Sequence, residues 1–315
     1  MAVTRLDVPG LIVGAVLVIA VVISAGVAVS VGTVPVPLRE VAATVAGRLG
    51  LLDPLVPPLT QHIVWELRAP RVVAAALVGA GLSVGGAVVQ SLTRNPLADP
   101  YLLGVSAGSA LGAVLVLALG TAAIPLLAGA TLSAGMTVAA FAGGLAALLL
   151  VLVLATGRDG SLQSNRLILA GARWPAVMIM LAVTLPILVI ITAYARTLDA
   201  FAFGERSAAS LGIAVHQTRW ILYVLVSLLT AALVSIAGIV GFVGLVVPHA
   251  VRLLAGPLHR RLLPLAALAG VLLMIWVDLL GRVLLPDSEI PLGIITAVIG
   301  VPFFVIILRR RQVRL

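Results

Sequence analysis

The sequence contains no cysteine, and all twenty of its basic residues are arginine rather than lysine. Without cysteine the chain can form neither disulfides nor thiolate metal sites. Aromatic residues make up 4% of the chain, too few for a surface that stacks nucleic-acid bases. Charged residues make up 10%, against about 25% in soluble domains. These shortages argue against a disulfide scaffold, a nucleic-acid-binding protein and an ordinary soluble domain.

Hydrophobic residues are abundant instead: they form 62% of the 315 residues, and the mean hydropathy is +1.26. Apolar runs of about 20 residues recur between short polar breaks, which is the length that a helix needs to cross a bilayer. A membrane β-barrel would alternate apolar and polar residues instead. We predict an all-α, polytopic membrane protein with a single transmembrane domain over 1–315. The predicted spans are 11–34, 71–91, 103–123, 133–156, 175–195, 218–238, 239–256, 262–285 and 291–308.

Arginines at the ends of these spans predict the orientation, because such residues concentrate on the cytoplasmic side. Counted from the N-terminus, Arg94 and the loop 158–166 are cytoplasmic. Counted back from the arginine-rich tail at 309–311, the loop 196–219 is cytoplasmic as well. Only one clear span, 175–195, separates the two loops, and one crossing cannot join two cytoplasmic loops. The sequence therefore contains a topological conflict near residue 170.

Four stretches resemble a known family of permeases. They read "LRAPRVVAAALVGAGLSVGGAVVQSLTRNPLADPYLLGVSAG", "FGERSAASLGI", "AGIVGFVGLVVPHAVRLLAG" and "VDLLGRVLLPDSEIPLGIITAVIGVPFF". In this order they resemble the permease subunits of type II ABC importers, the FecCD-type family that takes up iron-siderophores, haem and cobalamin. The resemblance implies a bundle of ten spanning helices with both termini in the cytoplasm.

The resemblance also implies partners and a location. The permease acts as a homodimer or heterodimer in the inner (cytoplasmic) membrane of a bacterium, with an extracytoplasmic substrate-binding protein above it. Two ABC ATPase subunits below it hold ATP and Mg, so the chain itself is a transport subunit that needs no cofactor and carries no catalytic or metal-binding residue. The sequence agrees in having no Walker loop, G-x-x-x-x-G-K-[ST], and no metal-ligand spacing among His62, His216, His249 and His259.

The chain departs from the family at "RLILAGARW", residues 166–174. In the family a helix that begins like "RLILAG" is followed by an outer segment that ends near "AGARW". Roughly 40 residues, a span of about 20 residues with the segment after it, are missing by this comparison. The departure near 170–173 coincides with the topological conflict.

By resemblance, two cytoplasmic segments carry the functional residues. The turn "RNPLADP" contains Asn95, Pro96 and Leu97, which match the cytoplasmic gate of the dimer; a simple turn between two helices is the alternative. The segment 204–214 matches the coupling helix that docks into the ATPase, and a solvated loop is the alternative. Its matching residues are Gly204, Glu205, Arg206, Ala209, Leu211 and Gly212.

Three arginines are predicted on the outer side, where arginine is unusual. Arg68 and Arg71 follow the polar segment 35–70, which we expect to be extracytoplasmic, and Arg282 ends the span 262–285. By resemblance they dock the binding protein; contact with lipid phosphate is the alternative. Asp278 lies four residues before Arg282, so an intramembrane ion pair between them explains a carboxylate that is otherwise costly in a span.

Two other function classes remain open at this stage. A proton-coupled secondary carrier would use Asp278 as part of a proton relay. An intramembrane serine hydrolase would use Ser106, which lies in a "GVSAG" motif, together with a histidine such as His249. This motif, however, normally needs a strand before the serine, and here the serine opens a predicted membrane helix.

Overall fold

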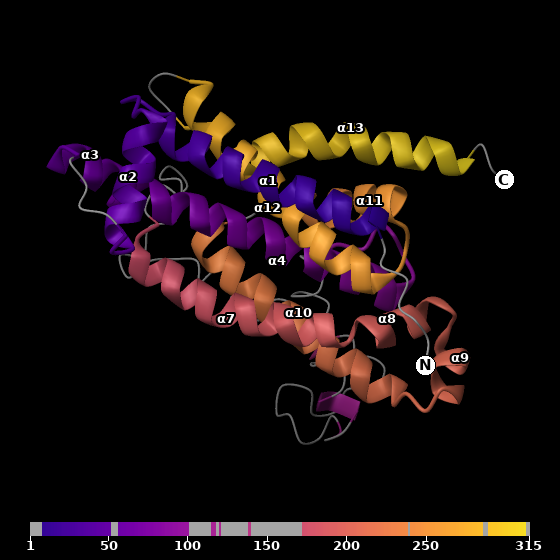
Figure 1. Ribbon diagram of the computed structural model, residues 1–315. Coiled ribbons are helices and arrows are strands. Elements are labelled where there is room, and N and C mark those ends of the chain that lie inside the picture. Colours follow the sequence, from indigo (N-terminus) through magenta and orange to yellow (C-terminus); the bar gives the residue numbers. More distant parts are fainter. Residues whose placement is uncertain are drawn as a thin grey trace.

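The computed structural model describes residues 8–51, 56–100, 115–117, 120, 138–139, 172–238, 240–285 and 289–312. The regular structure of these residues is helical, which confirms the predicted all-α class (Figure 1). The named helices are α1 (Val8–Ser30), α2 (Leu38–Arg48), α3 (Pro58–His62), the π-helical turn η1 (Ile63–Arg68), α4 (Ala69–Thr93), α7 (Trp174–Ala193), α8 (Ala195–Ala202), α9 (Glu205–Ser210), α10 (Val215–Ala237), α11 (Val243–Ala255), α12 (His259–Val283) and α13 (Leu292–Gln312).

Five helical segments of the described residues are long and apolar enough to cross a membrane. They are Gly10–Ser30, Pro58–Thr93, Trp174–Ala193, Val215–Val234 and His259–Val283. Each overlaps a predicted span. Helix α13 overlaps the last predicted span, and the predicted spans 103–123 and 133–156 fall outside the described residues.

Two predicted spans have different bounds in the structure. The span predicted at 71–91 belongs to a continuous helical segment that begins at Pro58 and passes through η1. The wide π-helical turn immediately precedes Pro70, which has no N–H to donate to the preceding turn. The span predicted at 239–256 is the 13-residue helix α11, which is about 20 Å long and shorter than the hydrocarbon core.

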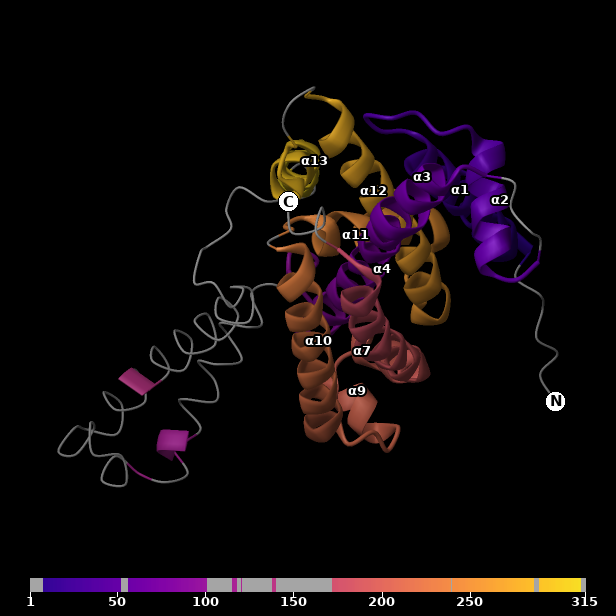
Figure 2. The ribbon, with the colours of Figure 1, turned by 90° about the vertical axis from the view of Figure 1, so that its left-hand side faces the viewer.

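Helix α4 lies at the centre of the bundle, with α12, α10, α11 and α7 packed around it (Figure 2). Its largest interface is with α12. Gly79 and Gly270 face each other there, and a Cβ added to either would overlap the backbone of the other. A Cβ added to Gly86 would likewise overlap the backbone of Gly244 at the start of α11, and one added to Gly244 would meet Pro100 and Leu82 O. Such small residues let membrane helices approach closely, so these glycines set the spacing of the central helices.

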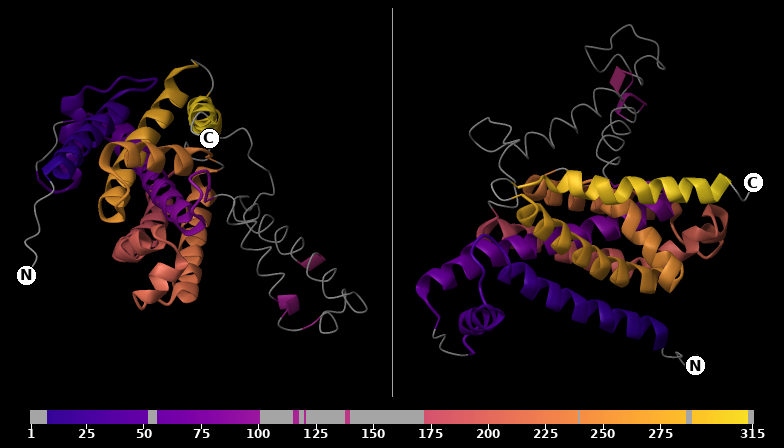
Figure 3. Two further views of the ribbon diagram at one scale, coloured as in Figure 1. Left: turned by 90° about the vertical axis from the view of Figure 1, so that its right-hand side faces the viewer. Right: turned by 90° about the horizontal axis from the view of Figure 1, so that it is seen from above.

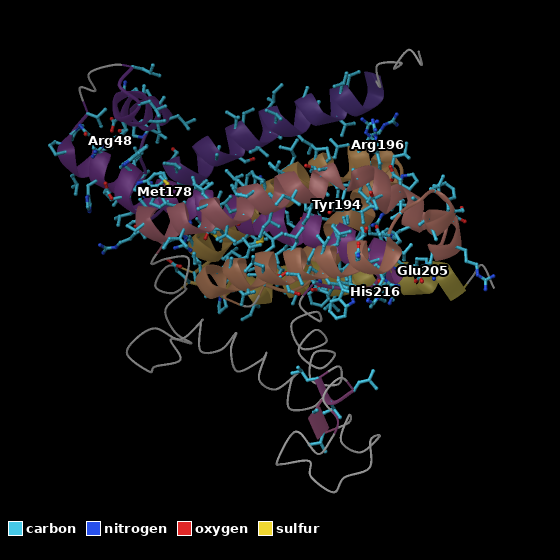
Figure 4. All side chains as sticks on the ribbon, turned by 90° about the horizontal axis from the view of Figure 1, so that it is seen from below. Arg48, Met178, Tyr194, Arg196, Glu205 and His216 are labelled. Atoms are coloured by element: carbon cyan, nitrogen blue, oxygen red, sulfur yellow. The ribbon has the colours of Figure 1, made fainter. Side chains whose placement is uncertain are left out.

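The peripheral helices show the two ends of the bundle. Helices α1 and α13 lie on opposite sides of α12 (Figure 3). One end of the bundle carries α2 and α3, and the other carries α8 and α9. Arg48 and Glu205 mark these two ends, and α7 runs from near the first to near the second (Figure 4). Helix α1 begins, and α13 ends, on the side of α8 and α9, which is the predicted cytoplasmic side.

Candidate functional site

The predicted gate residues form a tight turn at the C-terminal end of α4, on the predicted cytoplasmic side. Arg94 has φ 50°, in the left-handed region, and ends the helix. Asn95 N–H then donates to Gln90 O at 3.1 Å, and the Asn95 side-chain Oδ1 accepts a hydrogen bond from Leu97 N–H at 3.0 Å. An asparagine that binds the backbone two residues on stabilises a turn locally. The turn therefore has a fixed shape that depends on Asn95.

The predicted coupling segment folds into the short helix α9. It is bounded by Gly204 with φ 104° and Gly212 with φ 79°, conformations that residues with a Cβ rarely adopt. The two glycines turn the chain sharply before and after the helix, so that α9 stands out at the end of the bundle. This gives a conformational reason for two of the residues that the resemblance picked out.

Two large apolar side chains flank α9 and face outward. Phe203 is 81% exposed and Leu211 is 72% exposed. Arginines and acidic residues share this end, so these are apolar groups outside the predicted bilayer. The sequence analysis included Leu211 but missed Phe203, although a phenylalanine directly before the charged stretch "GER" was a signal that could have identified it. Exposed apolar side chains of this kind commonly mark a contact surface for another protein.

A polar contact joins the coupling segment to the end of α4. Arg219, on α10, places Nη1 2.6 Å from Glu205 Oε1 and donates from Nη2 to Leu92 O at 3.4 Å. Leu92 lies in the last turn of α4, three residues before Asn95. The gate turn and α9 are therefore neighbours at one end of the molecule.

At the other end, Arg71 is enclosed by carboxylates. Its Nε donates to Asp278 Oδ1 at 2.7 Å, and its two terminal nitrogens bind Glu289 Oε1 and Oε2 at 3.0 and 2.9 Å. Arg282 Nε lies 3.1 Å from the other Asp278 oxygen, an ion pair by distance that lacks hydrogen-bond alignment. Two positive and two negative groups thus balance within one cluster, which favours a structural role for Asp278 over a proton relay.

The remaining outer arginine contacts the end of α1. Arg68 donates to the carbonyl oxygens of Val29 and Ser30 at 2.8 and 3.0 Å, and it also binds Val34 O. Arg282 Nη2 donates to Ala28 O at 3.0 Å in the same turn. The last carbonyls of a helix lack partners within it and carry partial negative charge. These contacts explain how arginine is accommodated on the outer side.

The three predicted docking arginines are therefore engaged inside the protein. Arg68 and Arg71 are 8% and 5% exposed. Their docking of a binding protein stays a prediction, and their intramolecular contacts give them a second role. For the serine-hydrolase alternative, Ser106 lies outside the described residues, and His249 packs edge-on against Phe303 at 5.9 Å. No group of three potential metal ligands occurs among the residues that the structure describes.

The start of α7 lies at the outer end. The rings of Trp174 and Trp65 are 4.8 Å apart, and Trp174 Nε1 donates to Trp65 O at 2.8 Å. Trp65 belongs to η1, far from the gate turn at the opposite end of the Pro58–Thr93 segment. Residue 100 therefore lies at the end of the bundle that carries α8 and α9, and residue 172 lies at the end that carries α2 and α3.

Comparisons with known proteins agree with this architecture. The structure resembles a metal-chelate type ABC transporter solved in an inward-facing conformation, with a TM-score of 0.68 and 28% identity over 93% of this chain and 97% of the other. The cobalamin import permease BtuC of Halobacterium salinarum is 37% identical over 90% of this chain and 82% of its own. The Fe(3+) dicitrate permease FecD of Escherichia coli is 34% identical over 89% and 93%.

The alignments also locate a difference. The alignment with BtuC is 318 positions long. It includes 90% of the 315 residues of this chain, or about 284, so about 34 positions of BtuC have no matching residue in this chain. The alignment with FecD is 316 positions long and includes 89% of this chain, so about 36 positions of FecD have no matching residue. The model of the FecCD transport family matches in two segments, 16–173 and 169–310, which meet at the predicted departure. Because these segments cover nearly the whole chain, it belongs to the FecCD transport family.

Proposed function

We propose that this chain is the permease subunit of an ABC importer that takes up an iron-siderophore or a related metal chelate, such as haem or cobalamin, by ATP-driven alternating access. Family membership carries the proposal, together with relatives named as cobalamin, haemin and ferric dicitrate permeases. ATP and Mg bind to two separate ATPase subunits, and an extracytoplasmic binding protein delivers the ligand. The permease lies in the cytoplasmic membrane as a dimer.

Helix α9 and its flanking residues form the proposed contact with the ATPase. Phe203 and Leu211 supply exposed apolar groups, and Glu205 and Arg206 supply charge beside them. A central apolar contact within a polar rim is the usual composition of a protein interface. A secondary carrier or a hydrolase would not need such a surface. Movement of the ATPase subunits would reach the permease here and act on the neighbouring turn at Asn95, Pro96 and Leu97.

We also propose that the chain lacks one membrane crossing of its family. Between residue 100 at the cytoplasmic end and residue 172 at the outer end, the number of crossings must be odd, whereas the sequence contains two clear apolar spans there. The two-segment family match and the roughly 35 unpaired alignment positions support the loss of one span near 170–173. The arginines at 158, 166 and 173 make an irregular crossing costly. Transport by this chain is therefore expected to be slow.

Uptake into proteoliposomes tests both proposals. The chain is reconstituted with the ATPase that co-purifies with it, and ATP-dependent uptake of a ferric siderophore, haem and cyanocobalamin is measured with the binding protein present. In a second version, the segment of FecD that this chain lacks is inserted between residues 171 and 172. We expect ATP-dependent uptake of one probe, at least severalfold faster in the second version. Absence of ATP-dependent uptake in both versions would contradict the proposed function, and equal rates would contradict the missing crossing.

A further inference from the structure

Three polar side chains from three helices form a continuous, partly buried chain at the cytoplasmic end. Asp199 Oδ1, on α8, lies 2.7 Å from His259 Nδ1 and accepts a hydrogen bond from His259 N–H at 2.8 Å. His259 Nε2 lies 2.5 Å from Ser91 Oγ. His259 is the first residue of α12 and is 3% exposed, and Ser91 lies in the last turn of α4. We refer to Asp199, His259 and Ser91 as the cytoplasmic relay.

The contacts of Asp199 satisfy polar groups at the start of α12. The first N–H groups of a helix have no partner within it, and Asp199 binds the first N–H of α12, where the helix dipole also favours a negative charge. The carboxylate accepts a hydrogen bond from Nδ1–H, which leaves Nε2 of the neutral imidazole as the acceptor for the Ser91 hydroxyl. In a buried setting, loss of one partner leaves the others unsatisfied. The three residues therefore hold their helices together as a unit.

The order of these groups is that of a serine hydrolase triad, but the surroundings are not. Ser91 Oγ also lies 2.8 Å from Ala87 O of its own helix, so its single hydroxyl proton has a second acceptor there, as is common for a helical serine. A serine nucleophile in an elbow motif follows a strand, and Ser91 lies near the end of the 25-residue helix α4. The geometry thus favours a mechanical role over nucleophilic catalysis.

The relay lies between the proposed coupling surface and the proposed gate. Asp199 precedes Gly204, the start of the coupling segment, by five residues, and Ser91 precedes Asn95 by four. Arg219 makes a second, separate connection, because it binds Glu205 of the coupling segment and Leu92 O of α4. The last turn of α4 is therefore connected to this region twice: through His259 to α8, just before the coupling segment, and through Arg219 to Glu205 within it.

We propose that Asp199, His259 and Ser91 are positioning residues that transmit movement of the coupling segment to the gate turn at Asn95, Pro96 and Leu97. The inference rests on the proposed function as an ABC permease. When the ATPase displaces α8 and α9, the relay carries the ends of α12 and α4 with them. If the relay is interrupted at His259, α8 can move while the gate turn stays in place. ATP is then hydrolysed without opening or closing the gate.

The absence of natural cysteine allows the gate to be observed directly. Arg94 is exposed and lies directly before the gate turn, so Arg94→Cys introduces a single accessible thiol into the chain and keeps Asn95 in place. The complex with its co-purifying ATPase is placed in lipid nanodiscs. The rate of reaction of this thiol with a maleimide is measured without nucleotide and after trapping with ATP and vanadate, and ATP hydrolysis is measured in parallel. In the chain with an intact relay, we expect trapping to change the reaction rate severalfold.

Two variants interrupt the relay at different contacts. Ser91→Ala removes one oxygen and keeps the pair of His259 and Asp199. His259→Asn keeps a polar group near Asp199 but does not reach Ser91. Thr93→Val is the matched control, because the Thr93 hydroxyl bonds only within α4, to Val89 O at 2.7 Å. We expect both relay variants to hydrolyse ATP while the reaction rate of the thiol at position 94 no longer responds to trapping, and we expect the control to respond normally.

The outcomes separate the two proposals. A normal response in both relay variants would overturn the role of the relay while leaving the permease function intact. A chain with an intact relay that co-purifies with no ATPase would overturn the proposed function, and the relay proposal with it. A loss of response in Thr93→Val equal to that in Ser91→Ala would show a general effect of hydroxyl removal at this end of α4, and would also overturn the relay.

Discussion

Arg71 Nε donates a 2.7 Å hydrogen bond to Asp278 Oδ1, although the two residues are 207 positions apart in the sequence. The contact joins α4 to α12, the two helices with the largest shared interface. It also places the carboxylate of Asp278, 1% exposed, against two guanidinium groups. The outer half of the bundle is therefore held by charge as well as by close helix packing.

Arg71→Ala is expected to destabilise the protein strongly, because it leaves Asp278 with only Arg282 and releases Glu289. Removal of one partner from a buried ion pair costs about 3–5 kcal/mol. Thermal unfolding in detergent, followed by tryptophan fluorescence, measures the effect. Arg39→Ala is the control, since Arg39 is exposed on α2. A midpoint for Arg71→Ala equal to that of the control would show that the cluster contributes little.

Arg68→Ala is expected to loosen the end of α1, because Val29 O loses the Arg68 donor and Ser30 O keeps only the N–H of Val36. An unsatisfied buried polar group costs about 1–3 kcal/mol. Hydrogen exchange of the last turn of α1 should increase. The same variant tests docking: if affinity for the binding protein fell while exchange in α1 stayed unchanged, Arg68 would serve the partner rather than the fold.

Gly79→Ala is expected to lower stability, because the new Cβ overlaps the carbonyl of Gly270 across the interface of α4 and α12. Overpacking of a tight core costs about 1–3 kcal/mol. Gly241→Ala is a matched control, since a Cβ there meets no atom within 4 Å. The yield of folded protein on size-exclusion chromatography and the unfolding midpoint measure the difference. Equal behaviour of the two variants would contradict the assigned packing.

The topology on either side of the proposed deletion can be tested with single cysteines. Arg173 and Ser210 are both exposed, at the outer and cytoplasmic ends respectively. In intact cells, an impermeant maleimide should label Arg173→Cys and should label Ser210→Cys only after the membrane is permeabilised. Labelling of Ser210→Cys in intact cells, with protection of Arg173→Cys, would mean that the second half of the chain is inverted and cannot contact a cytoplasmic ATPase.

The apolar runs predicted the helices well, because a spanning segment must satisfy its own backbone and needs no distant partner. The bounds were wrong where the backbone departs from a regular helix. One example is the π-helical turn before Pro70. Another is the short helix α11, which follows two residues with positive φ, Gly238 and Phe242. A hydropathy pattern carries little information about such local changes in helical geometry.

Side-chain partners were less predictable than helices. The proximity of Asp278 and Arg282 follows from one helical turn, and this spacing could be seen in the sequence. The contacts of Arg71 with Glu289, and of His259 with Asp199 and Ser91, join helices far apart in the chain. They depend on which helices pack together, so they could be recognised only in the folded structure.

Co-purification of an ABC ATPase through α9 tests the central claim most directly. The affinity-tagged chain is isolated from its native membrane, and the eluate is assayed for an ABC ATPase and for vanadate-sensitive ATP hydrolysis. We expect the unsubstituted chain and the control Leu51→Asp, which alters a 70% exposed leucine at the outer end, to retain the ATPase. The double variant Phe203→Asp and Leu211→Asp, and a chain lacking 204–212, should lose it. Retention of the ATPase by both altered chains, or its absence from the unsubstituted chain, would contradict the account.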